Sequence, residues 1–178
     1  VAPVVFPRIA ALEGAEAARR RLTPIVARHA LWFGVAVASV VYVTAEWIVL
    51  FLGGAGFRDA TLPLRLLLPG IVSMGVARII ANDLSGRGRP GVNSLVSLIA
   101  LGANIALNLA WIPRFGASGA SLASTVSYTS LAVLLLVVYR RTTGVPWRDL
   151  LLLQREDALR LRTVTAAALR RRLRRTAR

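Results

Sequence analysis

A few charged and amide side chains inside long apolar segments are the residues of this chain that could do chemistry. Glu46 places a carboxylate within such a segment, where a charged group costs roughly 2.5–3.5 kcal/mol to insert into a bilayer. It shares a helical face with Ser39 and Tyr42, at spacings of seven and four residues. Two uses of this carboxylate are open. In the first, the carboxylate lines a cavity and binds a proton or a cation. In the second, it lies near the membrane interface, hydrated or paired with Arg58 or Arg65.

A second polar group closes the next apolar segment. Arg78 and Asn82 are four residues apart and therefore neighbours on one helical face, and Asp83 follows them. A guanidinium on an inner face would suit a diphosphate, because its planar donor fork matches phosphate oxygens. The alternative is that Arg78 snorkels to the headgroups with Asp83 as its local partner.

The third apolar segment carries a polar stripe on one helical face, formed by Asn93, Ser97, Asn104 and Asn108. Lipid does not solvate carboxamides, so this stripe faces protein or water. Hydrogen bonds between helices are one interpretation. Contacts of Asn104 and Asn108 with sugars in a cavity are the other.

Small residues mark one face of the fourth apolar segment: Gly116, Ala120, Ala123, Ser127 and Ser130. Such a face lets helices approach closely, which predicts helix packing at this position. Tyr128, and more weakly Thr125, are the candidates for a cavity lining in this segment.

Composition excludes several kinds of catalysis. The chain has no cysteine, all 23 of its basic residues are arginine, and His29 is its single histidine. A zinc site, a Ser-His-Asp triad and a lysine-bearing phosphate loop therefore lack their residues. We expect no enzymatic activity, no cofactor and no metal.

The elements that must position these side chains are four apolar segments of about 20 residues, at 31–52, 64–83, 92–112 and 117–139. This is the length of helix that crosses roughly 30 Å of hydrocarbon. With 56% hydrophobic residues and a mean hydropathy of +0.61, the 178-residue chain is too apolar for an ordinary soluble domain. The sequence predicts an all-α, polytopic transmembrane bundle of four spans.

The predicted organisation has three parts. Residues 1–30 form the end of an upstream span and a basic connector, residues 31–139 form the transmembrane region, and residues 140–178 form an Arg-rich tail. Because the chain begins with Val1 and its single methionine lies within a span, we expect it to be a piece of a longer protein.

Arginine distribution predicts the orientation. Nineteen arginines lie before the first span, in the connector 84–91 or in the tail, and three lie near the other two connectors. By the positive-inside rule, both ends of the chain are cytoplasmic. The tail combines an apolar run at 150–153, typical of a helix lying on a membrane surface, with a basic cluster at 170–175. Next to a span, such a cluster favours anionic lipid over nucleic acid.

Four sequence stretches resemble the C-terminal part of polysaccharide-transporter proteins of the O-antigen-flippase type, in the multidrug/oligosaccharidyl-lipid/polysaccharide exporter superfamily. They are VVFPRIAAL, AEWIVLFLGGAGF, RIIANDLSGRGRPG and NLAWIPRFGASGASLASTVSY. The last is the most specific, and the resemblance covers most of residues 1–147.

The resemblance implies a fragment of a two-lobed transporter of 12 to 14 spans in the bacterial cytoplasmic (inner) membrane. Such a protein flips lipid-linked oligosaccharide or polysaccharide precursors by alternating access, and a missing N-terminal lobe would complete the cavity. Two alternatives stay open. One is a cation-coupled multidrug exporter of the same superfamily, and the other is a non-transporting membrane scaffold for glycan-synthesis enzymes.

Overall fold

Helices make up almost all of the part of the chain that the structure describes. The computed structural model describes residues 2–152, with side chains at Glu16, at Arg20 and from Leu22 onward. Within these residues the elements, in chain order, are α1 (Ala2–Gly53), the 3₁₀ helix η1 (Ala55–Ala60), α2 (Thr61–Gly86), α3 (Pro90–Thr143) and α4 (Trp147–Leu151). The all-α prediction is confirmed for this part of the chain.

The first helix is longer than the predicted span. α1 runs without interruption from Ala2 to Gly53, so the connector before the first apolar segment is a helical continuation of it. Residues 8–22 consist largely of Ala, Arg, Leu and Glu, which are strong helix formers, and this composition accounts for the continuity.

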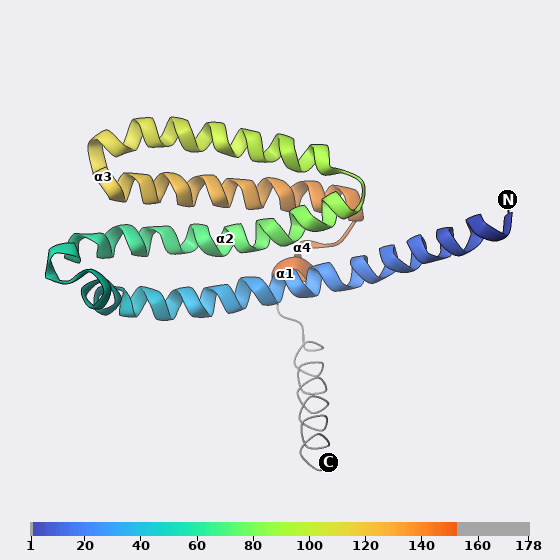
Figure 1. The fold of residues 1–178 in the computed structure, drawn as a ribbon, viewed down its shortest axis with the longest axis horizontal. Helices are drawn as coiled ribbons and strands as arrows, with labels where there is room; N and C mark the ends of the chain where they lie inside the picture. The colour runs from blue at the N-terminus through green and yellow to red at the C-terminus, as the bar shows by residue number, and fades with distance from the viewer. Residues whose placement is uncertain (1, 153–178) are drawn as a thin grey trace, which may run out of the picture.

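Helix α3 is folded back on itself at Gly116. This glycine has φ +55° and ψ −133°, which is not a helical conformation and is one that a side chain would strain. Figure 1 shows that α3 reverses direction there and forms two antiparallel arms, residues 90–115 and 117–143. The third and fourth apolar segments of the sequence are these two arms.

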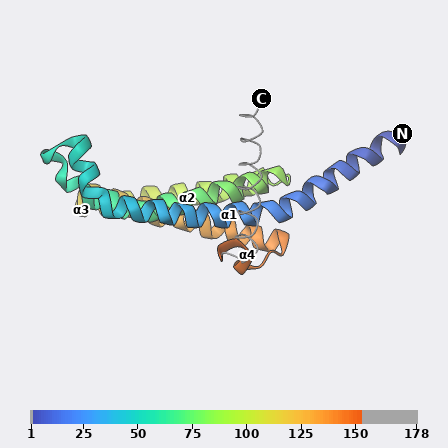
Figure 2. The same ribbon diagram turned by 90° about the horizontal axis from the view of Figure 1, so that it is seen from below.

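The long helices lie side by side in a single layer. In Figure 1 the order across the layer is the first arm of α3, its second arm, α2 and α1, so α1 forms one edge. Seen edge-on in Figure 2, the layer is thin, with α4 on one side of it and η1 at one end. We call the two ends of the layer the η1 end and the α4 end.

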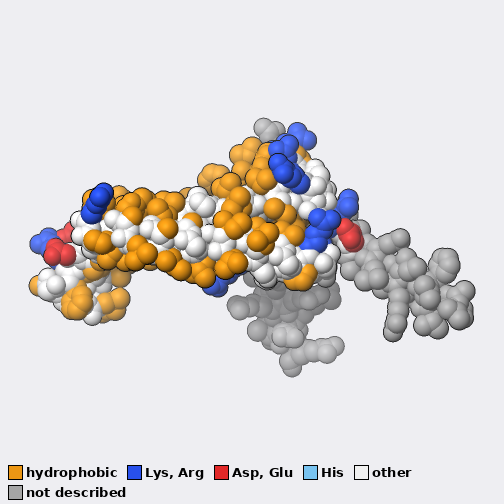
Figure 3. Space-filling model, turned by 90° about the horizontal axis from the view of Figure 1, so that it is seen from above, with side chains coloured by type: hydrophobic (Ala, Val, Ile, Leu, Met, Phe, Trp, Pro, Cys, Tyr) orange, Lys and Arg blue, Asp and Glu red, His pale blue; other side chains and the backbone are white. Residues whose placement is uncertain are grey.

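The layer leaves both of its faces open. Three stretches are long and apolar enough to cross a membrane: Leu22–Gly53, Ala55–Gly86 and Pro90–Thr143. Within the most apolar 18 residues of these stretches, only 6%, 33% and 6% of the residues are buried. Most of this apolar surface must therefore meet lipid or another protein layer. Figure 3 shows hydrophobic side chains along the length of the layer, with charged side chains mostly toward its ends. These features indicate a membrane-embedded protein.

Tight packing is concentrated at the α4 end. The side chains that are at most 1% exposed there come from four different helices: Ala27 from α1, Ala77, Ile80 and Leu84 from α2, Leu135 and Tyr139 from α3, and Leu150 from α4. This cluster fixes the helices relative to one another and leaves the rest of the layer accessible from both sides.

Candidate functional site on the open faces of the helix layer

Two grooves run along opposite sides of the seam between α1 and α2. Both are bordered by Ala38, Leu68 and Val72, which lie at the seam itself. One groove, of about 210 Å³, is lined only by apolar side chains and glycine. The other, of about 530 Å³, also contains the polar side chains of Ser39 and Ser73, and we call it the polar groove.

The polar side of the layer continues from the polar groove onto α3. The Ser73 hydroxyl lies 3.2 Å from the Thr129 hydroxyl. Thr129 and Ser130 in turn line a further groove of about 680 Å³ along the second arm of α3. We call the surface carrying Ser39, Tyr42, Ser73, Thr129 and Ser130 the polar face. It places hydroxyl groups from three helices on one side of an otherwise apolar layer.

Glu46 lies one helical turn beyond Tyr42, on the same side of α1. Its Oε1 accepts hydrogen bonds from Arg58 Nε at 3.0 Å and Nη2 at 2.5 Å. Arg58 is one of the two partners expected from the sequence. The carboxylate is therefore already neutralised by a cation from η1.

Arg65 lies against the end of the polar groove nearest η1. Its Nε donates to the Tyr42 carbonyl at 3.0 Å, and its guanidinium carbon lies 5.1 Å from the centre of the Tyr42 ring. Within the described part of the chain, no carboxylate forms an ion pair with Arg65. The contact with Tyr42 orders this cation without neutralising it.

Arg78 and Asn82 are on the other side of α2 from the polar face. They follow Ser73 by five and nine residues, which rotates them by about 140° and 180° on a helix of 3.6 residues per turn. Both side chains are exposed. The structure thus brings Arg78 and Asn82 together but not with Glu46. Asp83, the expected partner of Arg78, pairs elsewhere.

The asparagine pair makes a bond within one arm of α3, not between helices. Asn108 Nδ2 donates to the Asn104 carbonyl at 2.9 Å and to its side-chain oxygen at 3.0 Å. Asn104 Nδ2 is buried and makes no hydrogen bond to the described residues. Tyr128 is half-buried, and its neighbour Thr129 is the residue that meets Ser73.

Two residues of the predicted small-residue face, Ala123 and Ser127, are buried, and close packing also occurs at two glycines outside that face. A Cβ placed on Gly119 would lie 2.4 Å from the Trp111 carbonyl oxygen, so this glycine lets the two arms of α3 meet near their turn. A Cβ on Gly70 would lie 2.7 Å from the Thr125 Cα, and the Thr125 hydroxyl donates to the Leu66 carbonyl at 2.6 Å. Thr125 therefore helps to join α3 to α2.

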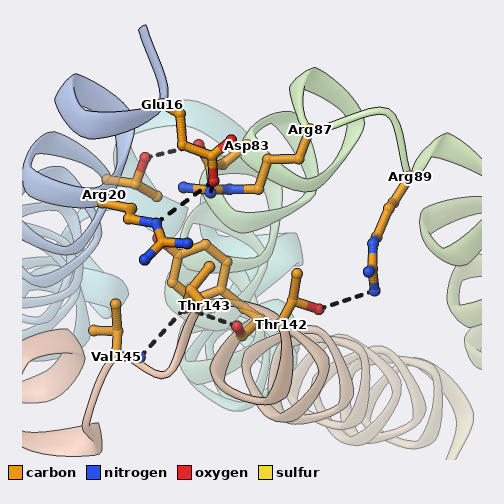
Figure 4. A network of polar contacts seen from close by, with 10 residues as sticks. Glu16, Arg20, Asp83, Arg87, Arg89, Thr142, Thr143 and Val145 are labelled. Atoms are coloured by element: carbon orange, nitrogen blue, oxygen red, sulfur yellow. Dashed lines mark hydrogen bonds and ion pairs between the residues drawn. The ribbon is translucent and has the colours of Figure 1, made fainter. Parts of the chain in front are cut away.

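A charged network at the α4 end was not predicted from the sequence. Arg87 donates through Nε to Asp83 Oδ2 at 2.6 Å and through Nη1 to Glu16 Oε1 at 2.8 Å, and Figure 4 shows both carboxylates directed at its guanidinium. Asp83 also accepts from the Thr23 hydroxyl at 3.1 Å. The Asp83 and Arg87 side chains are only 4% and 6% exposed, and Arg87 lies 5.8 Å from the centre of the buried Tyr139 ring. The network ties α1, α2 and α3 together.

The network keeps Arg87 charged. Burial alone would lower the pKa of this guanidinium and is the largest single influence. The hydrogen bond from Arg87 to Asp83 and the charges of Asp83 and Glu16 together outweigh it and raise the pKa above its usual value. The four-residue spacing of Asp83 and Arg87 was the available sequence signal, but the contribution of Glu16 depends on how α1 packs.

Helix α4 docks on the polar side of α1. Arg28 Nη1 donates to the Asp149 carbonyl at 3.1 Å, and Trp32 Nε1 donates to the Leu151 carbonyl at 2.9 Å. Trp32 precedes Ser39 by seven residues, so α4 covers the same side of α1 that carries the polar groove. The described part of the predicted surface helix thus packs on the protein. The rest of the tail, residues 153–178, lies outside the described residues.

No group of three or more His, Asp or Glu side chains suited to a metal ion occurs within residues 2–152. The chemistry that these faces offer is accordingly that of hydroxyl groups, an ion pair and an unneutralised guanidinium next to apolar grooves. Comparisons with protein-family models, with curated proteins and with solved structures find no match to this chain.

Proposed function

We propose that this chain is part of a membrane transporter that flips lipid-linked oligosaccharide or polysaccharide precursors across the bacterial cytoplasmic membrane. The observation that carries the proposal is the polar face on a single layer of membrane-length helices. The Ser39 and Ser73 hydroxyls donate to the Val35 and Pro69 carbonyls one turn earlier, at 2.8 and 2.9 Å, and can still accept hydrogen bonds, so this side of the layer is better suited than the opposite side to a second protein layer or water. Two such layers enclosing a cavity are the arrangement that alternating access needs.

In this proposal the layer crosses the membrane four times, with each arm of α3 counted as one span. The α4 end lies in the cytoplasm, because the arginines of the predicted cytoplasmic segments gather there. The polar face then lines the cavity, and the opposite face, which includes the apolar groove along Val37 and Ile71, meets lipid. A second lobe would face the hydroxyl groups of Ser39, Ser73 and Thr129 across the cavity.

The ion pair between Glu46 and Arg58 bears on the cation-coupled alternative. A carboxylate that binds a transported proton or metal ion has to release its protein cation in each cycle. Glu46 accepts two hydrogen bonds from one guanidinium, which favours a structural role at the η1 end over an ion-coupling role.

The test is export of lipid-linked glycan to the cell surface in a strain that lacks the gene encoding this chain. Accumulation of the lipid-linked precursor in the cytoplasmic leaflet, relieved by the intact gene, is the expected result. Normal surface glycan in the absence of a redundant transporter would rule out the flippase and favour the exporter or the scaffold.

Variants of the polar face sharpen this test. Ser73→Ala and Thr129→Val remove cavity hydroxyl groups and should reduce glycan export at unchanged protein level. Ile71→Val on the opposite face is the matched control and should export normally. Equal effects of all three substitutions would contradict the assignment of the cavity to the polar face.

A further inference from the structure

The end of the polar groove nearest η1 combines an apolar channel with an ordered, unneutralised cation. We propose that this groove binds one chain of an anionic glycerophospholipid, with the lipid phosphate held by Arg65. The lipid is a bound component of the protein and not its cargo, so this proposal does not depend on the transport function.

The hydrogen-bonding capacity of Arg65 is the first argument. Only its Nε is used within the described part of the chain, for the Tyr42 carbonyl, so the N–H groups of its two Nη atoms remain for a ligand. Two parallel N–H groups match two oxygens of a phosphate. Arg58 differs, because its guanidinium is already paired with Glu46.

The shape of the groove is the second argument. It follows α1 from Leu31 to Val43, which corresponds to about 18 Å at 1.5 Å per residue, close to the depth of one leaflet in a hydrocarbon core of roughly 30 Å. Its walls include Val35, Leu68 and Val72, and its volume of about 530 Å³ lies within the usual range of ligand pockets. A single acyl chain fits these dimensions.

The position of the groove gives a lipid access to it. α1 is the edge helix of the layer, so the groove lies one helix away from the surrounding bilayer (Figure 1). Arg65 is the second residue of the predicted span 64–83, so it lies at the η1 end of that span, and the groove runs from it toward Leu31 at the α4 end. A lipid of the leaflet at the η1 end can therefore place its phosphate and its chain in register with the site.

Charge selects the headgroup. A zwitterionic headgroup would bring an ammonium group beside the Arg65 cation. The carboxylate of Glu46, one turn from Tyr42, would not offset that ammonium group because it is already bound to Arg58. An anionic headgroup such as phosphatidylglycerol neutralises the cation without adding another. Attraction of about 1 kcal/mol per arginine near a membrane surface corresponds to about fivefold in affinity.

The experiment titrates the detergent-solubilised full chain with a short-chain phosphatidylglycerol and with the matching phosphatidylcholine, and it counts bound lipid by native mass spectrometry. The wild type should hold one phosphatidylglycerol with at least fivefold preference. Arg65→Ala should lose that preference, Arg65→Lys should keep part of it, and Arg114→Ala, an exposed arginine near the same end, should change nothing. Equal losses for Arg65→Ala and Arg114→Ala would show an unspecific charge effect and overturn the proposal.

A second pair of variants tests the groove itself. Ser39→Phe fills the groove and should abolish tight binding of the chain. Thr44→Phe is its control. Thr44, like Ser39, donates its hydroxyl to the carbonyl four residues earlier, but Thr44 does not line the groove. Tight phosphatidylglycerol binding to Ser39→Phe, or phosphatidylcholine binding equal to that of phosphatidylglycerol, would overturn the proposal.

Discussion

Removal of Arg87 should destabilise the helix layer far more than removal of its exposed partner Glu16. Arg87→Met leaves the Asp83 carboxylate, whose side chain is 4% exposed, with only the Thr23 hydroxyl as a donor. Breaking a buried ion pair in this way costs about 3–5 kcal/mol, because an uncompensated charge stays buried. The Glu16 side chain is 51% exposed, so Glu16→Gln should cost only about 0–1 kcal/mol.

The measurement is the free energy of unfolding in mixed micelles, titrated with dodecyl sulfate and followed by circular dichroism. The double variant Arg87→Met, Asp83→Asn should recover most of the loss, since no charge is then left buried. A cost for Arg87→Met below about 1 kcal/mol would refute the reasoning, because such a small loss is typical of an exposed pair. Additive costs in the double variant would refute it as well, since coupled partners should not add.

Three further predictions concern backbone geometry and α4. Gly70→Ala should lower the free energy of unfolding by about 1–3 kcal/mol, because the added Cβ would lie 2.7 Å from the backbone of α3. Gly75 has open space around it, so Gly75→Ala should be neutral or slightly stabilising in the same titration. Gly116→Ala should cost about 1–3 kcal/mol by straining a backbone at φ +55°, and Gly102→Ala, within a regular arm, should not be destabilising; equal thermal shifts for these two variants would contradict this. Trp32→Phe removes the hydrogen bond to α4 and should weaken its docking by about 1 kcal/mol, seen as faster amide hydrogen exchange in α4 but not in α2.

The sequence predicted the helical class and the positions of the apolar segments because these depend on local composition and length. It also included the partner of Glu46 among two candidates, since Arg58 and Arg65 were the two cations close along the chain and Arg58 is the one that pairs with it. The spacing of small residues predicted helix packing along the second arm of α3, where Ala123 and Ser127 are buried, but it did not identify the close approach at Gly119.

Which residues share a surface could not be predicted in the same way. The face that a helix buries depends on the rotation of its neighbours. The spacing of Ser73 and Arg78 puts them on different sides of α2, but it does not show which of the two sides shares a surface with Glu46. The burial of Arg87 required α1 to extend back to Glu16, more than 70 residues away in sequence. The polar face combines hydroxyl groups that are ordinary within each helix and become a site only when three helices lie side by side.

The most direct test of the central claim is the water accessibility of the two faces in the membrane. The chain contains no cysteine, so single cysteines can be introduced without other changes and exposed to a charged, membrane-impermeant thiol reagent. The account predicts that Thr129→Cys and Ser130→Cys react, because a cavity hydrates the polar face, and that Val37→Cys and Ile71→Cys do not. Reaction at Val37→Cys and Ile71→Cys with protection of Thr129→Cys and Ser130→Cys would contradict the account, because the cavity would then lie on the opposite face.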